Sequence, residues 1–293
     1  MTETPQDRYE RLKTRLAGLG SVLVAYSGGV DSTLLAVTAT LILGERAVCV
    51  LARSDTYPDS EAAHARAVAD ELGLSVLEVE TNELVDPAFR ANGPDRCYHC
   101  KSELFSLLRT VADTRGMRHI ADGSNVDDLG DHRPGRQAAA EFGVVSPLID
   151  AGLRKSDIRI LACELGLPNW DRPSMACLAS RFPYGEPIDE DRLTLVARAE
   201  DGLRALGLLQ FRVRAHGPVA RLEVAREEQD KAWAMREVVS AAIRGAGFAY
   251  VAQDLDGYRS GSLNETLSEA ETVAESGAAP AGVPRAAEAE TPA

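Results

Sequence analysis

Long hydrophobic runs are missing from this chain of 293 residues. No stretch of about 20 apolar residues occurs, which excludes a conventional membrane-spanning helix. The opening stretch, residues 1–12, is polar and mixed in charge, so no secretory signal is visible. A hydrophobic fraction of 45% and a charged fraction of 26% are typical of globular proteins, and we expect a cytoplasmic one.

Basic charge is scarce as well, and the formal net charge is −13. Neutralising nucleic-acid phosphates requires a basic surface, so an RNA-modifying enzyme is disfavoured, although not excluded. Residues 264–293 contain six Glu and one Arg and few large apolar residues, which predicts a disordered acidic tail. The rest of the chain is still acidic.

Cysteine is sparse, with five residues in the chain, and disulfides are disfavoured in a reducing compartment. Cys49 lies in an apolar run and Cys163 in a helical pattern, so both are expected to be buried core residues. The other three, Cys97, Cys100 and Cys177, lie in predicted loops.

A glycine-rich loop, AYSGGVDSTLL at residues 25–35, follows an apolar strand at residues 22–24 and precedes a helix that starts near Ser32. Glycines let backbone N–H groups approach a ligand, and a helix N-terminus favours a phosphate. Hydroxyls add donors, and a carboxylate suits Mg²⁺. The residues expected to bind ATP are Ser27, Gly28, Gly29, Asp31 and Ser32, with Asp31 as the magnesium ligand.

This loop resembles the PP-loop of ATP pyrophosphatases. The resemblance implies that ATP is cleaved between its α- and β-phosphates and that AMP is transferred to a substrate oxygen. An ordinary strand-to-helix turn with two glycines is the alternative.

Strands and helices alternate over the first half, which predicts a doubly wound parallel α/β sheet with its ligand at the carboxyl ends of the strands. The expected strands are 22–24, 47–52, 75–80, 119–121 and 144–148, and the expected helices are 59–72, 101–114 and 155–165, with 81–100 irregular. A proline-rich break at 168–173 ends a domain of residues 1–172. Residues 173–263 are expected to form a smaller α+β domain with helices 188–206 and 226–246 and strands 209–215, 219–224 and 248–254.

Polar residues follow the strand at 119–121. Asp122, Asn125 and Asp128 fit either a Mg²⁺ or nucleotide site or an Asx-rich turn. Arg133 and Arg136 fit either a phosphate or carboxylate site or a solvated surface pair.

Cys97 and Cys100 form a C-x-x-C pair next to Arg96 and Lys101, whose charge favours the thiolate form. Zinc would require four ligands, and His99, between the two cysteines, is poorly placed to join them. Three thiolates instead suit a [4Fe–4S] cluster with one open iron, where a bound sulfide could serve as a sulfur donor.

The chain resembles the LarE-type ATP-dependent sulfur transferases of the PP-loop superfamily over about residues 8–270. Besides the loop, three runs carry the resemblance: DHRPG at 131–135, SRFPYG at 180–185 and DGYRSG at 256–261. The resemblance implies adenylation of a carboxylate of pyridinium-3,5-biscarboxylate mononucleotide, with release of pyrophosphate. Sulfur then displaces AMP to give a thiocarboxylate, on the way to the nickel-pincer nucleotide.

The same resemblance implies that Arg212, Arg214 and Arg259 bind the substrate phosphate. Arg212 and Arg214 alternate on a strand and share a face, as two surface arginines also would. Glu200, Glu223 and Asp230 match acidic positions whose roles stay open. A homo-oligomer and a sulfur-donor protein are further implied partners.

Some members sacrifice one cysteine, at the position of Ala176 here, and are left with dehydroalanine. Cys177 and the C-x-x-C pair instead place this chain in a three-cysteine branch, which implies a [4Fe–4S] cluster on Cys97, Cys100 and Cys177. Sacrifice of Cys177, thiolation of tRNA, amide formation as in NAD or GMP synthetases, and ATP binding with a structural zinc remain alternatives.

Overall fold

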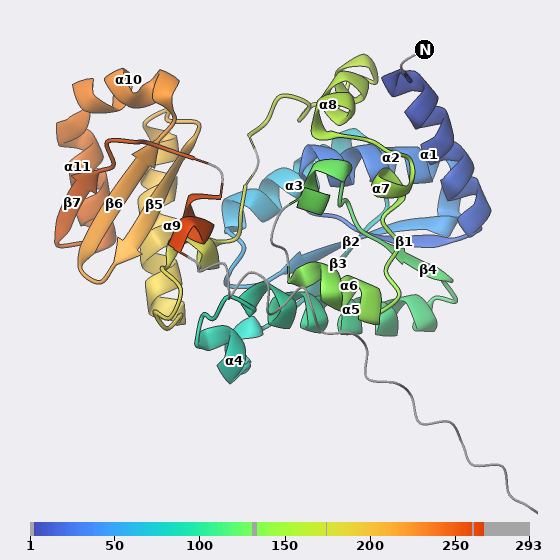
Figure 1. Ribbon diagram of the computed structural model, residues 1–293, viewed down its shortest axis with the longest axis horizontal. Coiled ribbons are helices and arrows are strands. Elements are labelled where there is room, and N and C mark those ends of the chain that lie inside the picture. The colour runs from blue at the N-terminus through green and yellow to red at the C-terminus, as the bar shows by residue number, and fades with distance from the viewer. Residues whose placement is uncertain (1–2, 131–133, 174, 260, 267–293) are drawn as a thin grey trace, which may run out of the picture.

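The computed structural model describes residues 3–130, 134–173, 175–259 and 261–266. The DHRPG and DGYRSG runs are therefore described only in part, and Arg133 and most of the predicted acidic tail lie outside the described residues. Two lobes, each built on its own sheet, lie side by side (Figure 1). Among the described residues, no helix has the length and apolar character needed to cross a membrane.

The larger lobe contains a four-stranded parallel sheet of order β3-β2-β1-β4. Its strands are β1 (Val22–Ala25), β2 (Ala47–Arg53), β3 (Val76–Glu80) and β4 (His119–Ala121). The predicted parallel α/β sheet is confirmed. The strand expected at 144–148 is reduced to a single bridge between Val145 and Ala121, because Pro147 starts a short helix instead.

Helices cover both faces of this sheet (Figure 1). Val22 and Val24 of β1 pack with α1 (Pro5–Leu19), α2 (Val30–Leu43) and α8 (Lys155–Glu164). Leu23, on the other face of the sheet, packs with α5 (Arg96–Thr114) and α6 (Gly135–Glu141). Alternation along the strand therefore supplies both halves of a doubly wound core. The helices of the larger lobe are α1 (Pro5–Leu19), α2 (Val30–Leu43), η1 (Gly44–Arg46), α3 (Asp59–Glu71), η2 (Glu83–Val85), α4 (Pro87–Arg90), α5 (Arg96–Thr114), η3 (Val126–Gly130), α6 (Gly135–Glu141), α7 (Pro147–Asp150) and α8 (Lys155–Glu164).

The smaller lobe contains a mixed sheet of order β5-β6-β7, in which β5 and β6 are antiparallel and β6 and β7 parallel. Helices α9 and α11 pack on one face of it. The helix expected at 226–246 is interrupted at Met235 and divides into three pieces. The elements are η4 (Leu178–Arg181), α9 (Glu190–Ala205), β5 (Phe211–His216), β6 (Val219–Val224), η5 (Arg226–Glu228), α10 (Gln229–Ala234), α11 (Arg236–Ala246), β7 (Tyr250–Gln253) and η6 (Ser262–Thr266).

The segment 81–100, expected to be irregular, holds η2, α4 and the first turn of α5. Phe89 belongs to the hydrophobic core of the smaller lobe, and Leu84 and Cys100 pack against it. Backbone N–H groups of Gly185 and Ile188 donate to the carbonyls of Asn92 and Arg90, both at 2.9 Å. This segment therefore joins the two lobes.

Candidate active site

The glycine-rich loop lies between β1 and α2, as expected, and its shape depends on Gly28. This residue has φ +69°, and a Cβ there would lie 2.6 Å from the Cβ of Ala65. The buried Asn169 fixes the loop from the far side, because its Nδ2 donates to the carbonyl of Gly28 at 2.7 Å and to Oγ1 of Thr33 at 3.0 Å. Only glycine fits this backbone position.

Hydroxyl groups line the N-terminus of α2, where Gly29 is the N-cap. Ser27 Oγ and Ser32 Oγ lie 3.1 Å apart, and the backbone N–H of Ser27 donates to Ser32 Oγ at 3.2 Å. A Cβ at Gly123, just after β4, would lie 3.0 Å from the backbone nitrogen of Ser32. The loop and the end of β4 thus converge on a helix N-terminus, which is the geometry that favours a phosphate.

Asp31 is the acidic group of this site. Its Oδ2 accepts from Nζ of Lys155 at 2.5 Å, whereas its Oδ1 is buried and has no hydrogen-bond partner in the described part of the chain. Burial raises the pKa of Asp31 and outweighs the opposing effect of Lys155; the carboxylate of Asp128 adds to the rise. A buried, unpartnered carboxylate oxygen that is near enough to a second carboxylate to be affected by its charge fits Mg²⁺, with ATP phosphates as further ligands.

The polar residues after β4 were expected to form either a Mg²⁺ or nucleotide site or an Asx-rich turn, and the structure shows some of each. Asp122 accepts from Oγ of Ser124 and Oγ of Ser146, both at 2.7 Å. Asn125 Oδ1 accepts from the backbone of Asp127 at 2.9 Å, which is an Asx turn. Asp122 and Asn125 therefore support the local chain. Asp128 also accepts from the backbone N–H of Asn125, at 2.9 Å, and its charge acts on Asp31.

Two cavities lie outside the loop. One, of about 360 Å³, is lined by the exposed Arg136 together with Asp122 and Ser124. The other, of about 450 Å³, lies against α10, α11 and β7, and none of the predicted site residues lines it. The volume of a cavity therefore does not identify the active site of this protein.

The three predicted cysteines come together from two segments. Cys97 and Cys100 lie on the first turn of α5, not in a loop, and Cys177 is the N-cap of η4. Burial raises the pKa of Cys97 and of Cys100, and the proximity of Cys177 raises both further. The thiolates expected from the neighbouring cations are therefore disfavoured in the free protein, because burial outweighs the charge of Lys101.

The three thiols are neighbours without forming a finished metal site. Cys100 Sγ lies 3.7 Å from Oε1 of the buried Glu83. Among the residues described, no three His, Cys, Asp or Glu side chains form a group that could hold a metal ion. The remaining cysteines are separate: Cys49 is buried, as predicted, but Cys163 is exposed, because α8 turns Ile158 and Leu161 inward instead.

Arg181 fixes the backbone of the segment that contains Cys177. It is fully buried and pairs with the fully buried Glu200 at 2.7 Å. Its Nη1 donates to the carbonyls of Ala176 and Cys177 at 3.1 and 3.2 Å. Glu200 also accepts from the backbone N–H of Val213, at 3.0 Å, between the two predicted phosphate ligands on β5. Glu200 is thus a structural link between the thiols and β5.

Arg212 and Arg214 lie on β5 and are nearly buried, which rules out a solvated surface pair. Burial and the nearby Arg181 lower the pKa of Arg212 to about 10, so it is still charged at neutral pH. Arg214 pairs with Glu223 at 2.9 Å, and its Nε is buried with no hydrogen-bond partner in the described part of the chain. Buried charge here is net positive: Arg181, Arg212 and Arg214 face Glu200 and Glu223.

Arg259 differs from the other two predicted phosphate ligands. Its side chain is 40% exposed and pairs with Glu265 at 3.0 Å. The adjacent Tyr258 nevertheless lies under the guanidinium of Arg212, 5.0 Å from the ring centroid, so this run does reach the arginines. Asp230 is exposed in the first turn of α10.

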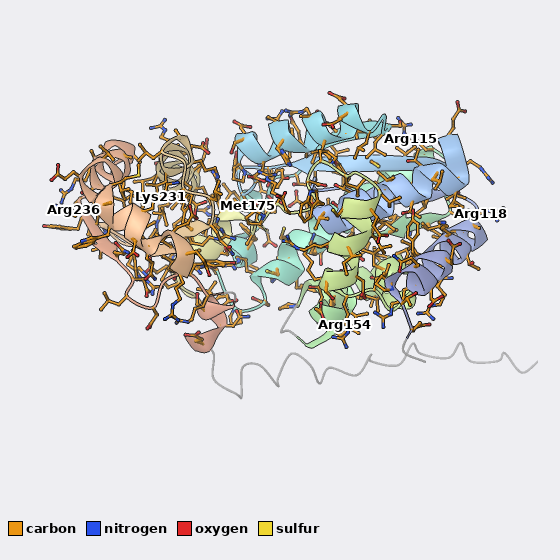
Figure 2. The ribbon with its side chains drawn as sticks, turned by 90° about the horizontal axis from the view of Figure 1, so that it is seen from above. Arg115, Arg118, Arg154, Met175, Lys231 and Arg236 are labelled. Atoms are coloured by element: carbon orange, nitrogen blue, oxygen red, sulfur yellow. The ribbon has the colours of Figure 1, made fainter. Side chains whose placement is uncertain are left out.

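Sequence reasoning missed Lys155 and Asn169, which contact the glycine-rich loop from the α8 segment. No local motif marks either residue. They precede the connection that leads to Met175, which lies between the two lobes (Figure 2). The ATP loop and the thiols are therefore linked by one short stretch of chain.

The fold and loop define an ATP-using enzyme of the PP-loop class. A model of the NAD synthase family matches residues 9–110. An uncharacterised protein of Synechocystis is 43% identical over 90% of this chain and 99% of its own length. The pyridinium-3,5-bisthiocarboxylic acid mononucleotide synthase of Lactiplantibacillus plantarum is 38% identical over 89% of this chain and 95% of its own. The chain therefore belongs to the LarE-type family of ATP-dependent sulfurtransferases, and the resemblance in its motifs is confirmed.

A more distant similarity connects the chain to RNA-thiolating enzymes. The tRNA-specific 2-thiouridylase MnmA of Azorhizobium caulinodans is 30% identical over 58% of this chain and 54% of its own length. This similarity covers little more than half of either protein.

Proposed function

We propose that this enzyme converts pyridinium-3,5-biscarboxylate mononucleotide into its bisthiocarboxylate, a precursor of the nickel-pincer nucleotide. The observation that carries the proposal is the combination of a PP-loop with three neighbouring cysteines in a chain that matches the Lactiplantibacillus synthase along nearly its whole length. Such an enzyme works where thiols stay reduced, and we assign it to the cytoplasm.

The first half of the reaction activates a carboxylate, which is a poor electrophile. A carboxylate oxygen of the substrate attacks the α-phosphorus of ATP, and the bond to the bridging oxygen breaks with release of pyrophosphate. Ser27, Ser32 and the N-terminus of α2 hold the phosphates. Asp31 and Asp128 would hold Mg²⁺, and a bound Mg²⁺ would neutralise the charge that develops on pyrophosphate.

Arg212 and Arg214 would bind the phosphate of the substrate. Their buried cluster carries one more positive than negative charge, and Arg214 Nε is a donor with no partner among the described side chains. A dianionic phosphate would balance the excess positive charge and accept a hydrogen bond from Arg214 Nε. Arg259 would join them after it exchanges Glu265 for the phosphate.

Cys97, Cys100 and Cys177 would hold the sulfur that displaces AMP. Three cysteine thiolates are the ligand type that binds a [4Fe–4S] cluster. In the described part of this structure the three side chains are not at metal-ligand spacing. A bound cluster would supply an open iron for sulfide. Sacrifice of Cys177 is the alternative source; a sulfur-donor protein and a homo-oligomer remain predictions.

The function is tested by incubating the full chain, prepared without oxygen, with ATP, Mg²⁺, sulfide and the dicarboxylate mononucleotide. We expect AMP release that requires the mononucleotide, and a product whose mass corresponds to replacement of carboxylate oxygen by sulfur. Arg212→Ala should raise KM for the mononucleotide, whereas Arg236→Ala, exposed on α11, should not. AMP release that depends on tRNA instead would establish the thiolase alternative.

A further inference from the structure

A short helical segment, η6, lies against two of the arginines that we assign to the substrate phosphate. It is drawn in red on the side of the smaller lobe that faces the larger one (Figure 1). Nη2 of Arg214 donates to Oγ of Ser262 at 3.1 Å. Nη2 of Arg259 donates to Oε2 of Glu265 at 3.0 Å. Both arginines are therefore already bonded to oxygen atoms of this segment.

The same segment contacts the side of the site where the cysteines lie. The hydroxyl of Tyr184 donates to Oδ1 of Asn264 at 3.1 Å. The guanidinium of Arg96 lies 5.3 Å from the ring centroid of Tyr184, and Arg96 precedes Cys97 in the chain. Residues 262–266, hereafter the strap, therefore connect the arginines with the SRFPYG run.

The contacts that hold the strap are individually weak. The side chains of Glu265 and Arg259 are 58% and 40% exposed, and an exposed ion pair adds little stability. Ser262 offers Arg214 only a neutral oxygen, and Nε of Arg214 has no partner among the described residues. A dianionic phosphate forms stronger, charge-assisted hydrogen bonds with guanidinium groups than a hydroxyl does. A phosphate should therefore displace the strap.

We propose that the strap is an internal competitor of the substrate, which occupies the phosphate site of the free enzyme and leaves it when the phosphate binds. In the free enzyme the carboxylate of Glu265 takes the place of a phosphate oxygen on Arg259. Displacement of the strap also separates Asn264 from Tyr184, so binding of phosphate is coupled to the segment beside the thiols. The inference rests on the phosphate-binding role proposed for the arginines and does not depend on the sulfur source.

Full-chain variants of the strap test this competition. Asn264→Ala removes a strap contact without changing the charge or touching an arginine, and Glu265→Gln weakens the ion pair. Each should bind the dicarboxylate mononucleotide about two- to fivefold more tightly in calorimetry, because the strap occupies the site in less of the free enzyme. Affinity for the corresponding nucleoside, which lacks the phosphate, should stay unchanged. Unchanged binding of the mononucleotide by Asn264→Ala, or an equal gain for the nucleoside, would overturn the proposal.

Asp256→Asn is the matched control for charge. Asp256 also pairs with Arg259, at 3.4 Å, but lies outside the strap. Its substitution removes the same negative charge beside the same guanidinium, and it should raise the affinity for the mononucleotide less than Glu265→Gln does. An equal or larger gain in Asp256→Asn would show that local charge, and not the strap, sets the affinity.

Hydrogen exchange of the unaltered chain gives a second readout. The backbone N–H of Asn264 donates to the carbonyl of Gly261 at 2.8 Å, a bond that loses its support when the strap leaves the arginines. Inorganic phosphate, like the mononucleotide, should therefore speed exchange in residues 262–266. Slower or unchanged exchange there would refute the proposal. Faster exchange with phosphate, in a chain that never thiolates the mononucleotide, would support the strap and refute the proposed function alone.

Discussion

Gly28 and Gly29 are adjacent in the PP-loop, but only the first requires glycine. Gly28 has positive φ and touches Ala65, whereas a Cβ on Gly29 would meet only Ser27 Oγ, at 3.5 Å. Gly28→Ala should lower the free energy of unfolding by about 2–4 kcal/mol, through backbone strain and overpacking. Gly29→Ala should lower it by less than about 1 kcal/mol. Denaturant unfolding of both variants checks this; equal losses would contradict the geometry.

The ion pair of Glu200 and Arg181 makes stability depend on pH. Burial alone would raise the pKa of Glu200, but Arg181 outweighs it and holds that pKa below the ordinary 4.5. Ionised Glu200 therefore contributes stability above pH 4.5, and this contribution is lost as the pH falls through the lowered pKa. Unfolding free energy should decline in acid, and the decline should be smaller in Glu200→Gln.

At neutral pH, Glu200→Gln should cost about 3–5 kcal/mol, because it leaves the buried Arg181 unpaired. Arg204, partly exposed and 3.3 Å from the same carboxylate, is the control, and Arg204→Gln should cost less than about 1 kcal/mol. If Glu200→Gln and the unaltered chain showed the same acid profile, the buried ion pair would not be the cause.

Secondary-structure elements were predictable where the chain is apolar and continuous. The central strands β1 and β2 are apolar runs that are largely buried on both faces, and nothing competes with that pattern. The first turn of α5 was missed because Gly93 and Pro94 precede it and polar residues fill it. The break at Met235 was missed because helical periodicity continues across it.

Contacts between distant elements could not be predicted at all. Lys155 with Asp31 and Arg181 with Glu200 depend on how helices pack, and the sequence around each residue gives no sign of its partner. Burial of Arg212 and Arg214 likewise comes from η4 and the Tyr258 segment lying over β5. The predicted site residues could be chosen from the sequence because a motif or the family resemblance marks each of them, and their roles stay predictions.

The first turn of α5 and the start of η4 together form the thiol site. If a cluster binds there, chain prepared without oxygen should contain about four irons and four acid-labile sulfides. Cys97→Ala should lose them, and Cys163→Ala, which alters an exposed cysteine of α8, should retain them. Iron and sulfide analysis with a visible spectrum checks this. Iron that is absent, or that survives in Cys97→Ala, would contradict it.

At the scale of the whole molecule, the proposed reaction would use residues of both lobes. The PP-loop belongs to the larger lobe and the arginines of β5 to the smaller one, while Cys177 lies where the chain passes from one to the other. Ser60 Oγ to Asp201 Oδ1, at 3.1 Å, and Leu178 N–H to the carbonyl of Thr56, at 2.9 Å, hold the lobes together.

The central claim is that these cysteines deliver sulfur repeatedly. The most direct measurement counts thiocarboxylate formed per chain, with excess ATP, mononucleotide and sulfide, and weighs the protein afterwards by intact mass spectrometry. The account predicts several products per chain and an unchanged protein mass. At most one sulfur transferred per chain, with the protein lighter by the mass of H₂S, would instead identify Cys177 as a sacrificial donor and contradict the account.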